Sequence, residues 1–281
     1  MFEFKHLCKC KYDDLTIDAL LAINHRDYSN VIKIVERATN FLRKEKALTQ
    51  VEEELNELYV LNLHFQLLSS VSLYWREIEM EQYYQSWWNL QDALDSIRRI
   101  KKFGYGAGQA AKFFEEQLSS LEKIYPYKLF SSMGVIVECY ECSICGSDMD
   151  SDECVHLKGE LYAGEMALAV AKNIKYIDHI ALVEDPKNKR LVIAPDDSSP
   201  VFNIFKLLVK GFDKQLKPLG FSRTVITEFM RPNENWVKLG RNSKCFCGSG
   251  KKYKKCCENQ SRMKQMHVDF IGQSIFALTS I

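Results

Sequence analysis

The sequence predicts an α+β multidomain fold: an N-terminal antiparallel helical bundle over 1–128, a small central α+β domain over 129–235, and a cysteine-rich C-terminal module over 236–281. Apolar residues recur at helical spacing through the first part. Short apolar runs separated by turn residues follow it, and two groups of cysteines lie in the second and third parts. A chain of 281 residues has room for two or three such domains.

The first part is expected to contain four or five helices. One helix face is marked by apolar residues at i, i+4, i+7, i+11 and i+14, namely Tyr83, Trp87, Leu90, Leu94 and Ile97. The run from Val51 to Phe65 carries apolar residues on more than one face, which predicts a central helix. Pro126 is expected to end this part of the chain.

The central part mixes short strands with a helix. We expect strands near 134–138, 176–183, 191–194 and 221–229, and a helix over 201–216. The turn residues Asp185 to Asn188 lie between the second and third of these strands.

The third part contains four cysteines within thirteen residues: Cys245, Cys247, Cys256 and Cys257. Four thiolates on so short a loop match one tetrahedral zinc site that is closed by protein ligands, which is the structural type. Gly248 and Gly250 lie inside the loop, where we expect positive φ angles that let the backbone turn toward the thiolates.

Residues 241–257, RNSKCFCGSGKKYKKCC, resemble the SEC-C motif, a small zinc module at the C-terminus of the SecA translocation ATPase and on many bacterial proteins. The resemblance implies that the four cysteines bind zinc and that the module contacts a SecB-like chaperone or the ribosome. The family usually has proline at the positions of Lys244 and Phe246 and an acidic residue at that of Ser243. Without the two prolines we expect a looser loop in the metal-free state.

The same region is strongly basic, with nine Lys or Arg and one acidic residue between Lys238 and Lys264. This charge suits an acidic protein, an RNA or an anionic surface. The expected partner-binding residues are Arg241, Lys251, Lys252, Tyr253, Lys254 and Lys255. Alternatives are a zinc site without a partner, a nucleic-acid-binding module, and a charge that serves solubility alone.

A second cysteine group lies in the central domain and predicts a zinc knuckle. The expected ligands are Cys142, Cys145, Cys154 and His156, so that the chain holds two zinc ions in all. Cys139 is an alternative to His156, because it lies one C-x2-C step upstream. A nuclease of the HNH kind would need a pair of metal-binding histidines after the knuckle, and His156 has no adjacent histidine.

Composition limits the class of protein. Ten cysteines that are clustered in a long chain favour metal binding in a reducing compartment, so we expect a cytoplasmic protein. The first eleven residues lack an apolar signal core, and no apolar run reaches the roughly 18 residues of a membrane span. No arrangement typical of a nucleophilic or acid–base active site is recognisable. The sequence therefore predicts a non-enzymatic zinc-binding interaction protein, and leaves the roles of Cys8 and Cys10 and the oligomeric state open.

Overall fold

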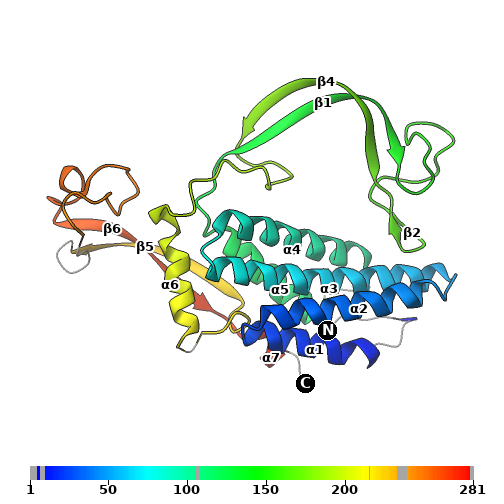
Figure 1. Ribbon diagram of the computed structural model, residues 1–281, viewed down its shortest axis with the longest axis horizontal. Helices are drawn as coiled ribbons and strands as arrows, with labels where there is room; N and C mark the ends of the chain where they lie inside the picture. The colour runs from blue at the N-terminus through cyan, green and yellow to red at the C-terminus, as the bar shows by residue number, and fades with distance from the viewer. Residues whose placement is uncertain (1–4, 7–9, 105–107, 215, 233–238, 279–281) are drawn as a thin grey trace.

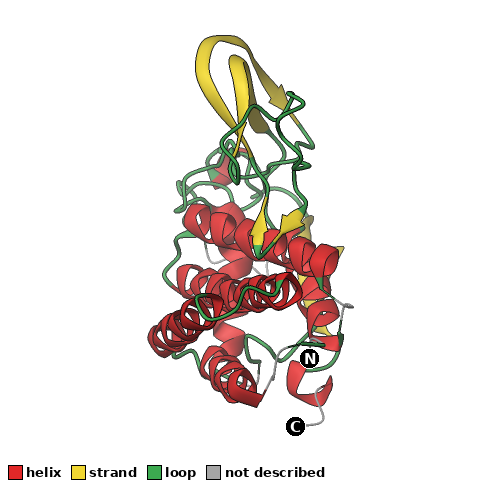
Figure 2. Cartoon of the chain, turned by 90° about the vertical axis from the view of Figure 1, so that its right-hand side faces the viewer, coloured by secondary structure: helices red, strands yellow, loops and turns green. Residues whose placement is uncertain are grey.

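The computed structural model describes residues 5–6, 10–104, 108–214, 216–232 and 239–278. Helices form the body of the molecule, and two long antiparallel ribbons of two strands each extend from it (Figure 1). Seen from the side, one ribbon lies above the layer of helices (Figure 2). The described residues include no helix that combines the length and the apolar character needed to span a membrane.

Five successive helices form the body: α1 (Cys10–Asn24), α2 (Tyr28–Lys46), α3 (Glu52–Glu79), α4 (Tyr83–Phe103) and α5 (Gln109–Glu122). Each helix packs against the next, as short connections between neighbouring helices require. The carboxylate of Asp27 accepts a hydrogen bond from the amide of Asn30 and so caps the start of α2. The sequence prediction of four or five helices is confirmed.

Helix α3 is the central element and buries side chains on several faces, including Leu55, Phe65 and Trp75. Its long apolar sequence explains this position, because a helix that is hydrophobic all round must be covered on all sides. The face predicted for α4 is confirmed, since its five residues are each at most 4% exposed: Tyr83, Trp87, Leu90, Leu94 and Ile97.

The first ribbon consists of β1 (Phe130–Cys142) and β4 (Ala169–Val183). The strands pair in antiparallel register, with Phe130 opposite Val183 at the base and Cys142 opposite Ala169 at the far end. We call this ribbon the arm; it arches over α4 (Figure 1). The predicted strands at 134–138 and 176–183 both lie within it and are confirmed.

The second ribbon consists of β5 (Arg223–Pro232) and β6 (Arg262–Ile271), again in antiparallel register. The predicted strand at 221–229 corresponds to β5, whereas β6 is not predicted by the sequence. The strand predicted at 191–194 is wrong: Val192 forms a single bridge to Phe130, because β4 takes β1 as its partner.

The remaining elements are short: β2 (Leu161–Tyr162), β3 (Glu165–Met166), η1 (Pro200–Phe202), α6 (Asn203–Phe212), η3 (Tyr253–Lys255) and α7 (Ile275–Leu278). Together, η1 and α6 match the helix predicted over 201–216, which ends earlier than expected.

One hydrophobic core joins the bundle to the later elements. Phe202, Phe205 and Phe212 are buried in the same cluster as Trp75 and Tyr83 of the bundle. Stacked rings connect them, with 4.5 Å between the ring centroids of Tyr83 and Phe202. This core crosses the predicted boundary at residue 128, and the division of the chain into three domains stays a prediction.

Candidate metal centres

The C-terminal cysteine module lies between β5 and β6, at the end of the second ribbon (Figure 1). A small hairpin shapes it: the amide of Cys245 donates to the carbonyl of Lys251 at 2.6 Å, and the amide of Tyr253 donates to that of Ser243 at 2.8 Å. The positive φ angles predicted for the two loop glycines are confirmed at 77° and 71°. In this conformation a side chain would be strained, so glycine suits both positions.

The four thiols of this module converge. The ligand atoms of Cys245, Cys247, Cys256 and Cys257 all lie within 4.8 Å of one another. The Sγ atom of Cys256 lies 3.3 Å from that of Cys247 and 3.7 Å from that of Cys257. A tetrahedral zinc site with Zn–S bonds of about 2.3 Å would place its sulfur atoms about 3.8 Å apart. The spacing therefore fits one tetrahedrally bound ion.

Two adjacent cysteines reach the same point because the backbone coils before them. The 3-10 turn η3 ends at Lys255, and the amide of Cys256 donates to the carbonyl of Tyr253 at 3.0 Å. In an extended strand, Cys256 and Cys257 would point to opposite faces. The turn brings both toward one side.

Tyr253 lies in the interior of this module. Its side chain is 8% exposed and clusters with Cys245 and Cys257, with Leu239 and Phe246 packed beside them. The sequence prediction placed this ring in the partner-binding surface. The structure instead makes it the main apolar side chain of a very small core.

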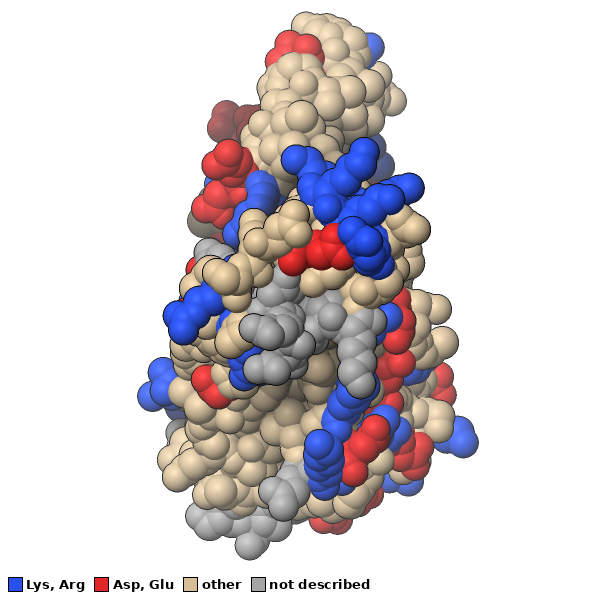
Figure 3. Space-filling view, turned by 90° about the vertical axis from the view of Figure 1, so that its left-hand side faces the viewer, with Lys and Arg blue, Asp and Glu red and all other residues tan. Residues whose placement is uncertain are grey.

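The basic side chains of the module point outward. Lys251, Lys252, Lys254 and Lys255 are exposed. Arg241 is also exposed, and its guanidinium pairs with the carboxylate of Glu258 at 2.7 Å. In the view onto this end of the molecule, Lys and Arg side chains gather in one group beside a few acidic ones (Figure 3). The four lysines thus form a basic surface around the cysteine loop.

The central cysteine module lies at the far end of the arm, between β1 and β4 (Figure 1). Cys142 is the last residue of β1, and the chain then turns through Gly146, which has a φ angle of 76°. The amide of Gly146 donates to the carbonyl of Cys142 at 2.9 Å, and the amide of Ile144 points to the Cys142 sulfur at 3.5 Å. Such a tight turn presents two cysteines to one ion.

The central cluster consists of Cys142, Cys145, Cys154 and His156, whose ligand atoms also lie within 4.8 Å of one another. The Sγ atoms of Cys145 and Cys154 are 3.7 Å apart, again close to a tetrahedral edge. The Nδ1 atom of His156 is buried and has no hydrogen-bond partner among the residues that the structure describes. Cys139 is not a member of the group, so the geometry favours His156 as the fourth ligand.

The His156 ring is oriented by an aromatic neighbour. Its centroid lies 4.7 Å from that of Tyr162, with the rings nearly perpendicular at 88°. The Tyr162 hydroxyl accepts a hydrogen bond from the amide of Leu157 at 2.9 Å. The tyrosine therefore holds the segment that carries the histidine, a role that the sequence did not reveal.

Both clusters contain one thiol with an unusually low pKa in the metal-free chain. A hydrogen bond from the Ser147 backbone and, as the second cause, one from the His156 side chain lower the pKa of Cys145 to about 6. The hydroxyl of Ser249 lowers the pKa of Cys247 to about 6. A thiolate is the form that binds metal, so each cluster offers at least one ready ligand at neutral pH.

The central module also contacts the bundle, which sequence reasoning did not predict. The turn between β2 and β3 reaches the start of α3, where the amide of Gly164 donates to the side-chain oxygen of Asn56 at 2.8 Å. Gly164 has a φ angle of 75°, and a Cβ atom there would lie 2.7 Å from the carbonyl oxygen of Leu55. Lys102 adds a bond of 2.7 Å to the carboxylate of Glu160. The only sequence signal was the glycine itself.

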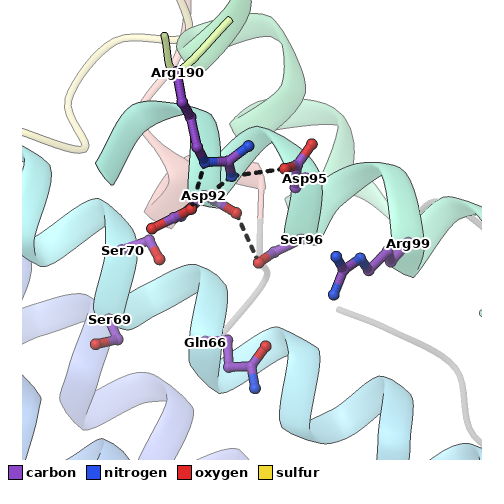
Figure 4. A pocket seen from close by; sticks show the side chains of 8 residues that line it. All are labelled: Gln66, Ser69, Ser70, Asp92, Asp95, Ser96, Arg99 and Arg190. Atoms are coloured by element: carbon purple, nitrogen blue, oxygen red, sulfur yellow. Dashed lines mark hydrogen bonds and ion pairs between the residues drawn. The ribbon is translucent and has the colours of Figure 1, made fainter. Parts of the chain in front are cut away.

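A polar pocket of about 300 Å³ lies between α3 and α4 (Figure 4). Its lining residues are Gln66, Ser69, Ser70, Asp92, Asp95, Ser96, Arg99 and Arg190. The guanidinium of Arg190 bonds to the carboxylate of Asp92 at 2.6 Å and to that of Asp95 at 2.7 Å. The charge of Arg190 is thus paired with two carboxylates, and these ion pairs hold the segment after β4 against α4.

Taken together, the C-terminal loop has the architecture of a small cysteine-based metal-binding module. Residues 241–259 match the family model of the SEC-C motif, which confirms the resemblance seen in the sequence.

The similarity to whole proteins is short. This chain is 64% identical over 31 residues to protein translocase subunit SecA of Thermodesulfovibrio yellowstonii, which covers 11% of this chain and 4% of SecA. It is 50% identical over 38 residues to UPF0225 proteins of Yersinia pestis and Yersinia pseudotuberculosis, covering 11% of this chain and 25% of each relative. No solved structure matches the chain.

Proposed function

We propose that this chain is a zinc-binding interaction protein whose C-terminal module docks through its basic surface onto a protein partner, such as a SecB-like chaperone or the ribosome. The observation that carries the proposal is the position of the module. Four convergent cysteines lie at the end of a ribbon, surrounded by the exposed Lys251, Lys252, Lys254 and Lys255.

Zinc is the metal that suits both clusters. Tetrahedral sites with four thiolates, or with three thiolates and one imidazole, are typical of structural zinc. Four thiolates around Zn²⁺ carry a local charge of about −2, which the neighbouring lysines offset. The SEC-C match supports the same metal.

A structural role for both ions follows from the number of ligands. Four protein ligands complete a tetrahedral shell, whereas a catalytic zinc site keeps one position for water or substrate. This supports a non-enzymatic protein and argues against a metal-dependent nuclease.

The basic surface supports an acidic protein partner. Exposed lysines steer association and fix orientation more than they add affinity, so the complex should form quickly and weaken with salt. SecA carries the related module, which makes a SecB-like chaperone the first partner to test.

The test uses the full chain, because β6 pairs with β5 and a C-terminal deletion would remove half of that ribbon. Binding of the zinc-loaded protein to purified SecB and to ribosomes is compared with that of the double variant Lys254→Glu, Lys255→Glu. We expect at least tenfold weaker binding. The matched control is Lys33→Glu, Lys44→Glu, which reverses two exposed lysines on α2 and should bind normally.

Equal loss in both double variants would contradict a specific docking surface. Competition by free RNA would instead favour the nucleic-acid alternative, together with a salt dependence of roughly 0.7 in log–log slope per phosphate contacted.

A further inference from the structure

The arm carries a stripe of exposed apolar side chains on one face. Six large residues form it: Met133, Val170, Ile174, Ile177, Ile180 and Leu182, with exposed fractions of 53%, 40%, 62%, 55%, 68% and 61%. We call this set the apolar stripe. Large exposed apolar patches on a folded chain mark a site of interaction.

Two β-bulges place these residues on the same face. Ile180, Ile177 and Ile174 are three residues apart, so in a regular strand they would alternate between faces. The register shifts in β1–β4 each skip one residue of β4, so that Met133 pairs with Ile180, Val135 with Ile177, and Val137 with Ile174. Bulges of this kind re-aim side chains and are built features of a sheet.

The stripe faces away from the bundle at the base of the arm. Phe130 and Val183 pair there and point to the opposite face, where Phe130 is 3% exposed in the core. That opposite face is mixed, because the exposed Ile136, Tyr140 and Tyr176 share it with polar groups. There the side-chain amide of Asn173 donates to the carboxylate of Glu138 at 2.8 Å, and the His179 ring lies against Gly134. The face that carries the stripe is therefore the more apolar of the two, and its large side chains are the more exposed.

We propose that the apolar stripe is the contact between two copies of this chain, packed face to face about a twofold axis at the centre of the arm. A sheet of two strands is marginal in water and needs a hydrophobic face that is covered. A second copy brings the same stripe, as an isologous interface requires.

The area suits such a pair. A fully exposed large aliphatic residue offers roughly 170 Å², so complete burial of all six at these fractions would remove on the order of 500 Å² per copy. Two copies together would bury about 1,000 Å², which is the size of a weak, reversible interface. The intermediate exposure of Val135 and Val137 on the same face adds to this area.

The charge of the stripe also favours a copy over a charged partner. On this face of β1 and β4, the register places Lys172 between Ile174 and Val170 and Glu141 opposite Val170, and these two charges pair with each other at 3.1 Å. Because the two charges pair with each other, the face has no unpaired charge among these residues that would favour an acidic peptide or a nucleic acid. A neutral apolar surface is complementary to itself.

The test is the mass of the zinc-loaded full chain in solution, measured by sedimentation equilibrium up to about 100 µM, where a pair with a small interface should form. We expect twice the chain mass. Ile177→Lys lies at the centre of the stripe and should leave a monomer. The matched control is Tyr176→Lys, which is the next residue on β4, is 58% exposed on the opposite face, and should still pair.

A charge rescue tests the twofold contact itself. Since Ile177 would lie near the axis, mixing Ile177→Lys with Ile177→Glu should restore a mixed dimer that neither variant forms alone. A monomeric wild type at the highest concentration, equal behaviour of the two lysine variants, or no rescue would overturn the proposal. Binding to neutral phosphatidylcholine vesicles that Ile177→Lys abolishes would also overturn it, in favour of a lipid surface.

Discussion

The two cysteine modules share a chemistry and differ in their surroundings. Both lie at the far end of an antiparallel ribbon of two strands, and both gather four ligands within 4.8 Å. The central module is bonded to the bundle, through Gly164 to Asn56 and through Lys102 to Glu160. The C-terminal module instead surrounds its cluster with exposed lysines. The same kind of cluster thus lies in a module that is bonded to the bundle in one case and in a module with a charged surface in the other.

The two modules show that the same set of candidate metal ligands can lie in very different surroundings. Few apolar side chains support either loop, and the C-terminal core is little more than Tyr253 with two cysteines. In such small units, metal binding supplies on the order of 10 kcal/mol of folding free energy. What remains without the metal depends on contacts to the rest of the chain.

The largest expected effect is therefore on metal content and local order. Cys257→Ser and Cys142→Ser should each lower the zinc content from two ions to one, counted by native mass spectrometry. In Cys257→Ser, residues 239–261 should lose all protection from hydrogen exchange. In Cys142→Ser, protection should persist at Ala167, whose amide bonds to the carbonyl of Glu160 at 2.9 Å beside the bundle contact.

Equal loss of protection in both modules would show that the bundle contact does not support the central one. Fewer than two zinc ions on the wild-type chain would contradict the assignment of two sites.

A smaller effect is expected from replacing two glycines, Gly164 and Gly250, that both have a positive φ angle. The two replacements should differ in how much they destabilise the fold. Gly164→Ala should destabilise the contact between the central module and α3 by about 1–3 kcal/mol, because the strain of the left-handed conformation adds to the clash with the Leu55 carbonyl. Gly250→Ala has the strain alone, about 1 kcal/mol, because nothing lies within 4 Å of its Cβ position. Hydrogen exchange measures both costs, and a larger cost at Gly250 would contradict the comparison.

The smallest expected effect concerns the low-pKa thiols. In the reduced chain, after a chelator has removed the metal, Cys247 should be alkylated quickly by iodoacetamide at pH 7. Its lowered pKa makes it a thiolate above about pH 6. Ser249→Ala removes the main cause and should raise this pKa, slowing the reaction about three- to tenfold. Ser147→Ala should change Cys145 little, because the backbone amide remains the main cause there. Mass spectrometry of the labelled peptides measures both rates.

Local features of the molecule could be predicted from the sequence. The spacing of Cys245 to Cys257 and of Cys142 to Cys154 brings ligands together within one loop, so no distant contact was needed. The positive φ angles of Gly248 and Gly250 follow from the same local reasoning. The buried face of α4 follows from its periodicity.

Features that depend on distant contacts could not be predicted. β1 and β4 pair although the whole central module separates them in the sequence. Nothing in residues 191–194 indicates that this run forms a single bridge and no strand. In β6, the polar residues Arg262, Lys264 and Gln265 interrupt the apolar alternation that would predict a strand. This segment is a strand because it pairs with β5. The burial of Tyr253 depends on a core too small for a sequence pattern to show.

The central claim is that the C-terminal module binds the partner while the central module orders the chain. The most direct measurement compares the binding of zinc-loaded wild type, Cys257→Ser and Cys142→Ser to SecB and to ribosomes under identical conditions. The account predicts that Cys257→Ser loses binding and Cys142→Ser retains it within about threefold. Retained binding in Cys257→Ser, or equal loss in both variants, would contradict it.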